Sequence, residues 1–481
     1  MSDPKLPSLK YSIFTLLTIT LLIVVGITLF DAKLQIMLFI SLIVAIPLAM
    51  KIGFNFLEVE NFAYDMIRKV LQPMLILLAV GALIGAWIFS GTVPTIIYAG
   101  LEIISPNYFL ATVVILCAFV SLATGSSWGT VGTAGVAMMG IGSGLGIPVG
   151  ITAGAVVSGA WFGDKMSPLS DSTNMAPALS GGDIVTHIKH MMWTTIPALI
   201  LSIITFHIIG LRYDGGNIDQ GQITSITSSL DELFNIGWVT IIPAIVVLTL
   251  LIMQKPAVTS IFVGALAGAA VGVLYQGFSI SESLSALYNG FIIETGNPFM
   301  DDLLNGGGVV SMYEIVAIFI FALGLGGILS GSGILTSILN SFASRIKTNR
   351  GLLLMTILVS YTTNMIGATI SFALIMTATI MRPLYEKRRV RPENLSRVIE
   401  DVGTLGGPII PWNTGAVFVS GALGVSPMHF IPFCFLSFFT LIITVIYSIT
   451  GFTIKTYDDD DGLPEETPIA FPSETRKSIA K

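Results

Sequence analysis

Residues 163–178 read GDKMSPLSDSTNMAPA, a polar stretch inside a chain that is otherwise strongly apolar. It places two carboxylates, Asp164 and Asp171, directly after residues 147–163, which carry no charge. An ionised carboxylate at membrane depth is costly unless a partner compensates it. Pro168 lies between the two acids and disfavours a regular helix there. The stretch therefore predicts a broken membrane helix whose opened backbone lies beside buried acids.

The composition places most of the chain in a membrane. Of the 481 residues, 53% are hydrophobic and 11% are charged, whereas a soluble domain carries about 25% charged residues. Apolar runs recur from Tyr11 to Phe452, so we expect one transmembrane domain over 1–452 and an acidic cytoplasmic tail over 453–481. The net charge of -6 lies in loops and in this tail, which leaves no basic surface for nucleic acid. The expected fold is an all-α polytopic membrane protein whose partner is the lipid bilayer.

Several apolar runs are suited to cross the bilayer as continuous helices, because a crossing takes about 20 residues. These runs are Tyr11–Phe30, Leu34–Met50, Leu71–Ser90, Met191–Leu211, Ile236–Met253, Ala257–Gln276, Gly308–Ser330 and Pro427–Phe452. Other apolar regions are interrupted by Gly, Ser and Thr, namely Tyr108–Ser143, Ile147–Ser180, and Gly351–Met381 paired with Asn394–Gly424. Irregular backbone at membrane depth is tolerated only where protein or a water-filled cavity supplies hydrogen bonds. We therefore expect the functional site in the interrupted regions.

Charge in the loops predicts the orientation. Basic residues cluster in three loops, at Lys51, Arg68 and Lys69, at Arg345, Lys347 and Arg350, and at Lys387, Arg388, Arg389 and Arg391. The charged residues of loop 276–307 are all acidic, namely Glu282, Glu294, Asp301 and Asp302. Short basic loops face the cytoplasm. With about ten full crossings and both termini in the cytoplasm, the loops fall on the expected sides.

The two halves of the chain show a weak internal repeat. Residues 124–130 read TGSSWGT and residues 363–369 read TNMIGAT, and each is followed about 40 residues later by an acid and a polar break. Arg350 and Arg382 bracket 351–381, so that region fits a hairpin entering from the cytoplasm, whereas 108–143 fits one entering from outside. We predict inverted repeats over about 71–211 and 308–452, each with a re-entrant hairpin and a broken helix, and a site at the midplane.

The predicted ion site consists of carboxylates and hard oxygen donors at the two breaks. Its residues are Asp171, Asp164, Ser167, Thr173, Asn174, Asp401, Asn413 and Thr414. Asp171 is the first choice for the carboxylate that sodium and a proton share, and Asp164 is the second. Lys165 is expected to form a salt bridge with one of these two aspartates. The alternative is that 164–174 is a cytoplasmic loop with solvated acids.

The hairpin centres supply a second set of polar groups, predicted to contact a substrate. They are Thr124, Ser126, Ser127, Thr130, Asn364 and Thr369. The alternative is that the hydroxyls bond only to the preceding helical turn. Glu400, beside Asp401, is open to a solvated interpretation. His187 and His190 are expected at a solvated or interfacial position, with cytoplasmic pH sensing as the alternative.

The stretch 163–178 closely resembles the signature of the NhaC-type sodium/proton antiporter family. Residues 123–130 (ATGSSWGT), 187–190 (HIKH), 400–404 (EDVGT) and 410–414 (IPWNT) are similar to it as well. The resemblance implies an electrochemically driven antiporter of the ion-transporter superfamily, with inverted repeats and often an elevator-like motion. That family also includes sodium-coupled exchangers of organic acids such as malate and lactate, and the likeness does not separate the two activities. A homodimer is left open.

The predicted function is exchange of sodium for protons across a bacterial or archaeal cytoplasmic membrane. Burial raises the proton affinity of a carboxyl group and a bound cation lowers it, so either ion neutralises the site in turn. The first alternative is a sodium- or proton-coupled antiporter of organic acids or amino acids, in which helix N-termini bind the substrate carboxylate. An intramembrane protease would need a paired catalytic set, such as Ser with His or two aspartates in Gly-Asp settings, and besides Gly163-Asp164 the other Gly-Asp, Gly182-Asp183, is in a loop. A channel would not show saturable exchange. We expect no enzyme activity and no cofactor, sodium and protons being cargo.

Overall fold

The computed structural model describes residues 6–68, 71–103, 105–213, 220–253, 255–297, 300–301, 304–343 and 348–457. Parts of the charge argument lie outside these ranges, namely Lys69, Asp302, Arg345, Lys347 and the tail beyond residue 457. Within the described residues the chain is helical, and its β-structure consists of two isolated bridges, Phe291 with Gly306 and Val390 with Thr456. The all-α prediction is therefore confirmed for these residues.

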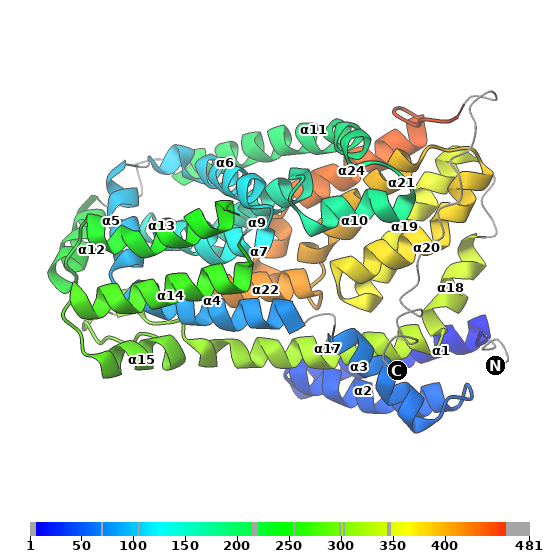
Figure 1. Cartoon of the computed structure of the whole chain (residues 1–481), viewed down its shortest axis with the longest axis horizontal. Coiled ribbons are helices and arrows are strands. Elements are labelled where there is room, and N and C mark those ends of the chain that lie inside the picture. The colour runs from blue at the N-terminus through cyan, green and yellow to red at the C-terminus, as the bar shows by residue number, and fades with distance from the viewer. Residues whose placement is uncertain are drawn as a thin grey trace, which may run out of the picture.

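Three N-terminal helices lie beside a long helix from the second half: the second and third pack on that helix, and the first packs on the second. They are α1 (Leu9–Phe30), α2 (Leu34–Met50) and α3 (Phe56–Arg68), and the long helix is α17 (Tyr313–Gly331). Figure 1 shows α1–α3 in blue beside α17 along the lower edge of the molecule. Glycine permits the close approach, because a Cβ atom added to Gly327 would lie 2.3 Å from the Phe62 carbonyl oxygen.

The first half supplies one helical hairpin and one broken helix. Its elements are α4 (Leu71–Phe89), α5 (Thr92–Ile103), α6 (Pro106–Thr124), α7 (Ser127–Thr130), a π-helical turn (Val131–Gly135), α8 (Val136–Gly144), α9 (Val149–Met166), α10 (Asp171–Ser180) and α11 (Ile184–Gly210). α6 ends because Gly125 adopts a positive φ of 69°, and Ser126 then caps α7 by accepting a hydrogen bond from the Gly129 N–H at 3.0 Å. The chain reverses there, so that Gly142 of α8 lies beside Phe109 near the start of α6.

α9 runs parallel to α6 at very close range. A Cβ atom added to Gly159 would lie 2.4 Å from the Val114 carbonyl oxygen, and one added to Gly163 would lie 2.4 Å from the Leu122 amide nitrogen. Small residues allow this approach between membrane helices. α9 then ends at Met166, and a short turn over residues 167–170, which contains Pro168, separates it from α10. The predicted break between Asp164 and Asp171 is present.

Four helices connect the two halves in the sequence, after a 3-10 turn (Leu211–Tyr213). They are α12 (Gln220–Leu233), α13 (Trp238–Ile252), α14 (Ala257–Leu274) and α15 (Ile280–Asn289). α14 packs against α4 and α13. The start of α15 carries a capping box, in which Ser279 and Glu282 exchange side-chain to backbone hydrogen bonds. In Figure 1 these helices lie in the left half of the molecule.

The second half also contains a helical hairpin and a broken helix. After a 3-10 turn (Val309–Met312) come α17, α18 (Ile334–Ala343), α19 (Asn349–Gly367), α20 (Ile370–Lys387), α21 (Pro392–Ile399), a π-helical turn (Glu400–Thr404), a 3-10 turn (Gly407–Ile409), α22 (Thr414–Leu423), α23 (Pro427–Phe430), a 3-10 turn (Ile431–Phe433) and α24 (Phe435–Thr450). α19 ends at Ala368, which has a φ of 51°, and Thr369 caps α20. Thr363 and Thr377 hydroxyl oxygens lie 3.0 Å apart, which shows that α20 folds back along α19.

The two hairpins approach each other from opposite ends of the molecule. Figure 1 shows α6 and α7, in blue and cyan, reaching the centre from the left, and α19 and α20, in yellow, reaching it from the right. By length and composition, four of the described helices can each cross a membrane, or up to seven spans if each of three bent helix pairs counts as one. The expected total of about ten crossings stays a prediction.

Candidate functional site

A cavity of about 770 Å³ lies where the two hairpin tips meet the two breaks. Thr124 and Ser126 from the first hairpin and Thr369 from the second line it, together with Asp164 at the end of α9 and Thr414 at the start of α22. Positions far apart in the sequence therefore converge on one space. This volume is in the range of small-molecule pockets, about 300–1,000 Å³.

Asp164 is the carboxylate at the centre of this convergence. The Ser127 hydroxyl donates to its Oδ2 at 2.6 Å, and the Ser170 hydroxyl donates to its Oδ1 at 2.5 Å. Ser127 belongs to the tip of the first hairpin and Ser170 to the break before α10, so the carboxylate ties the two together. The side chain is half-buried and lines the cavity. Asp164 is thus fixed by hydroxyl groups on one side and accessible from the cavity on the other.

Three further predicted ion ligands donate their hydrogen bonds to the opened backbone. Ser167 donates to the Leu122 carbonyl at 2.8 Å. Thr173 donates to the Lys165 carbonyl at 2.8 Å, and Asn174 donates through Nδ2 to the Ser170 carbonyl at 2.7 Å. The Thr173 bond satisfies a carbonyl at the end of α9 and the Ser167 bond one at the end of α6, whereas the Ser170 carbonyl also accepts from the Asn174 N–H at 3.1 Å. In this structure the three side chains stabilise the break that positions Asp164.

Asp171, the first choice from sequence, occupies a different environment. It is the first residue of α10, lines the cavity and is exposed. A carboxylate in the first turn of a helix interacts favourably with the helix dipole. The structure therefore places both predicted acids on one cavity, with Asp164 the more enclosed of the two.

The remaining hairpin residues divide between the cavity and the interior. Ser127 and Thr130 are buried, and the Thr130 hydroxyl donates to the Ser126 carbonyl at 2.9 Å, the bond to the preceding turn that was the alternative interpretation. The Thr124 hydroxyl bonds similarly to Ser121 at 3.5 Å while lining the cavity. Thr369 uses its oxygen to cap α20 at 3.2 Å.

Asn364 joins the second hairpin to the second break. Its Nδ2 donates to the Gly403 carbonyl at 2.7 Å, and its Oδ1 accepts from Asn413 Nδ2 at 2.7 Å. The Thr414 N–H also donates to the Ala368 carbonyl at 2.8 Å. Of these residues, Thr414 lines the cavity and the others do not. The side-chain amides of Asn364 and Asn413 therefore hold the hairpin tip against the break.

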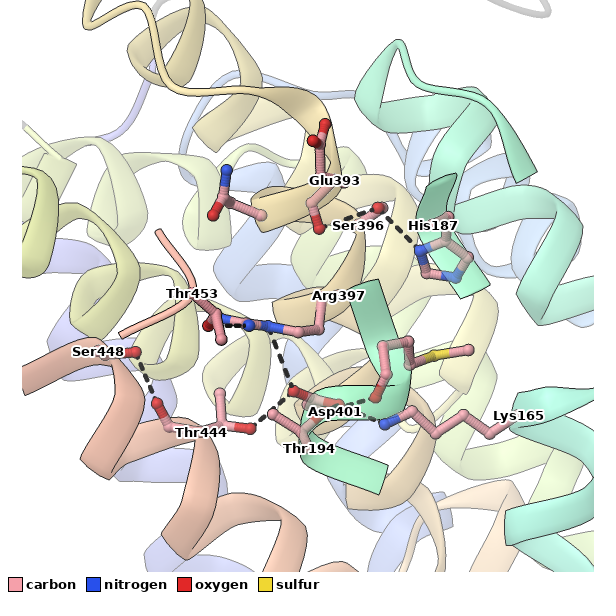
Figure 2. Close-up of polar contacts among 12 residues, drawn as sticks. Lys165, His187, Thr194, Glu393, Ser396, Arg397, Asp401, Thr444, Ser448 and Thr453 are labelled. Atoms are coloured by element: carbon pink, nitrogen blue, oxygen red, sulfur yellow. Dashed lines mark hydrogen bonds and ion pairs between the residues drawn. The ribbon is translucent and has the colours of Figure 1, made fainter. Parts of the chain in front are cut away.

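Asp401 lies in a separate, fully enclosed cluster, which Figure 2 shows in close-up. Its Oδ1 forms an ion pair with Lys165 and accepts from the Thr194 hydroxyl at 2.9 Å. Its Oδ2 accepts from the Thr444 hydroxyl at 2.7 Å and lies 3.9 Å from Arg397 Nε. The expectation that Lys165 would pair with Asp164 or Asp171 is wrong, because the partner comes from the other half of the chain. Asp401 does not line the cavity.

Glu400 is a buried acid that the sequence left open to a solvated interpretation. It is fully buried, and Lys165 and Asp164 lie within electrostatic range of its carboxyl group. The solvated interpretation of Glu400 and Asp401 is therefore wrong. The available signal was their position between apolar residues and the glycines that follow, in a region already expected to be interrupted.

The expectation of solvated or interfacial histidines is also wrong. His187 and His190 are each 1% exposed. His187 Nδ1 lies 2.8 Å from the Ser396 hydroxyl, so α11 contacts α21 through this pair. Among the residues that the structure describes, no group of three or more His, Cys, Asp or Glu side chains is arranged to hold a metal ion.

Comparisons with known proteins place this geometry in a family. A family model described as "Na+/H+ antiporter family" matches residues 159–452, which include both breaks and the second hairpin. The chain belongs to the Na+/H+ antiporter family. The match begins five residues before Asp164, and it includes Lys165, Asp401 and their neighbours.

Several curated relatives are similar over almost the whole chain. The malate-2H+/Na+-lactate antiporter of Bacillus subtilis is 41% identical over 452 residues, which are 94% of this chain and 96% of that protein. The Na+/H+ antiporter NhaC of Alkalihalophilus pseudofirmus is 36% identical over 91% of this chain and 95% of its own length. The arginine/ornithine antiporter ArcD of Halobacterium salinarum is 33% identical over 86% of this chain and 85% of that protein. These relatives are all named as antiporters, and their names differ in the cargo.

Proposed function

We propose that the protein exchanges sodium for protons across the cytoplasmic membrane, and that Asp164 is the carboxylate that the two ions occupy in turn. One observation carries this proposal: Asp164 is bonded to a hairpin tip through Ser127 and to a helix break through Ser170, and it lines a cavity. Carboxylate and hydroxyl oxygens are hard ligands, which suit a small hard cation. The two carboxylate oxygens are thus held by the hairpin tip and by the helix break.

The exchange follows from the cost of an unpaired charge. An ionised Asp164 without a cation is expensive to carry through a low-dielectric region, so the empty site stays where it is. A bound sodium ion or proton neutralises the carboxylate, and the site can then move between the two sides. Because both ions use the same group, one must leave before the other binds. Exchange then needs no covalent step and no cofactor.

The arrangement of the hairpins supports two membrane-related parts of this proposal. The tips meet from opposite ends of the molecule, as inverted repeats require. Helices α6–α11 pack with α19–α24, whereas α17 packs with α2 and α3 and α14 packs with α4, which fits one helix group moving along another. We place the basic segment 382–397, and with it both termini, in the cytoplasm.

The test is sodium-driven proton movement in proteoliposomes containing purified Asp164→Asn. We expect exchange to be lost, since the amide cannot compensate a cation or bind a proton. Asp231→Asn is the matched control, because Asp231 is exposed on α12 and does not line the cavity. Asp171→Asn forms the third arm. If Asp171→Asn abolishes exchange and Asp164→Asn does not, the shared carboxylate is Asp171 and the assignment to Asp164 is wrong.

A second candidate function is sodium- or proton-coupled antiport of a small organic acid. The cavity is far larger than a sodium ion, and Lys255 and the first residues of α20 line it together with the acids. The 41% identical relative named for malate and lactate points the same way. Counterflow of labelled malate or lactate, with and without sodium, separates the candidates. Sodium-proton exchange that neither acid alters would exclude this second function.

A further inference from the structure

The two halves of the chain place one acid each at the same point of the repeated plan, at the end of the helix that follows the hairpin. In the first half this acid is Asp164, and in the second half it is Asp401. Asp164 has hydroxyl partners and opens to the cavity. Asp401 is sealed from the cavity and forms an ion pair with Lys165, as Figure 2 shows. The two corresponding sites therefore differ in that one already contains a cation.

Lys165 is supplied to Asp401 by the half that contains Asp164. It follows Asp164 directly in α9, and its side chain reaches across to the π-helical turn of the second half. Both side chains of the pair are 0% exposed. A buried ion pair is weak support for stability, because an apolar pair of similar volume is often as stable or more so. Its charges therefore call for a role beyond packing.

The charge balance of the interior gives that role. Asp164, Glu400 and Asp401 contribute three negative charges when ionised, and Lys165 and Arg397 contribute two positive charges. Glu393 is also buried, but Lys455 lies 3.7 Å away as its counter-ion, and the cavity-lining Asp171 and Lys255 carry opposite charges. One negative charge remains, which one sodium ion or one proton neutralises. Without Lys165 the same interior would need two cations.

We infer that Lys165 is a built-in cation that occupies the second acidic site and thereby limits the carrier to one transported cation per cycle. This inference rests on the proposed exchange at Asp164. Lys165 touches no transported ion and acts through Asp401, so it is a positioning residue. Arg397 lies 3.9 Å from Asp401, farther than Lys165, and contacts Thr453 on its other side, so it complements the pair without replacing Lys165.

The experiment counts sodium ions bound to purified protein in detergent at about pH 9, where protons compete little with sodium for a carboxylate. The wild type is expected to bind one ion per chain at saturation, and Lys165→Met is expected to bind two. Asp401→Asn leaves the ammonium group without its counter-ion beside Asp164, so its sodium affinity should fall at least about ten-fold. The double variant, Lys165→Met with Asp401→Asn, restores the charge balance and should bind one ion with an affinity within about three-fold of wild type.

The outcomes separate this inference from the proposed function. A wild type that binds no sodium refutes the proposed exchange. A wild type that binds one ion, with a folded Lys165→Met that also binds one, overturns the inference about Lys165 alone. If Lys165→Met does not fold, the comparison of Asp401→Asn with the double variant decides, because a loss of affinity that persists in the double variant overturns the inference. A purely structural pair would lower the melting temperature of each variant and leave the ion count at one.

Discussion

Gly163 controls how closely the first hairpin approaches the acid that follows it. A Cβ atom at this position would lie 2.4 Å from the Leu122 nitrogen and 2.5 Å from both the Ala118 carbonyl oxygen and the Ser121 Cβ atom. These are largely backbone atoms of α6, which cannot rotate away. Gly163→Ala must therefore separate α9 from α6 by about 1 Å to reach ordinary van der Waals contact.

The separation acts directly on the site, because Asp164 is the next residue. The bond from Ser127 to Asp164 is 2.6 Å long, and a displacement of about 1 Å takes it beyond hydrogen-bond range. A hydrogen bond to a charged group contributes about 1.5–3 kcal/mol, which corresponds to a loss of sodium affinity of roughly ten- to hundred-fold if sodium binding needs this geometry. Ser127→Ala removes the same bond without the steric contact and should change the affinity in the same direction.

The assay is the sodium concentration that gives half-maximal proton exchange in proteoliposomes, with the melting temperature measured on the same preparations. Gly182→Ala is the control, since an added Cβ there meets Pro392 at 3.4 Å, an ordinary contact. The control should match the wild type. A folded Gly163→Ala whose half-maximal sodium concentration stays within about two-fold of wild type, together with an unaltered Ser127→Ala, would refute the reasoning that this contact sets the geometry of the ion site.

Two further predictions concern the second hairpin and a helix cap. Asn364→Ala removes the amide that joins the hairpin tip to Gly403 and leaves buried carbonyl and amide groups without partners. The melting temperature should therefore fall by an amount equivalent to about 1–3 kcal/mol. An unchanged melting curve would show that the tip does not depend on this bond. Asp183 caps α11, and the hydrogen bonds from Thr186 hold the pKa of its carboxyl below the usual value. A lowered folded-state pKa contributes stability that is present above the unfolded-state pKa of about 3.9 and is lost as the pH falls through the folded-state value. Asp183→Ala should therefore cost about 1 kcal/mol near neutral pH and less in acid, and a melting-temperature difference that is the same at both pH values would contradict this account.

Much of the site was predictable because the local sequence dictates it. The break after Met166 follows from Pro168 and its polar neighbours, and the hairpin tip follows from Gly125 and the cap at Ser126. Such features act over a few residues, so spacing and residue type are enough to find them. The convergence of both tips on one space was also expected from the repeat.

The pairing of Lys165 was not predictable, because its partner is 236 residues away. Spacing favoured Asp164 or Asp171 for local reasons, and only the packing of α9 against the second half selects Asp401. The same limit explains why His187 was expected outside the interior and why the burial of Glu400 was not predicted. A polar residue between apolar runs can lie in a loop or be buried by a distant helix, and the tertiary contacts decide between these outcomes.

The ion pair between Lys165 and Asp401 also affects how the protein is synthesised. A ribosome completes α9 long before it reaches the π-helical turn of the second half, so the ammonium group enters the nascent assembly with no counter-ion. An unpaired charge cannot be sealed into a dry interior. Until translation delivers Asp401, Lys165 must therefore stay near water or be present as the neutral amine. The sealed, charged form of the pair can form only after the second half has been made.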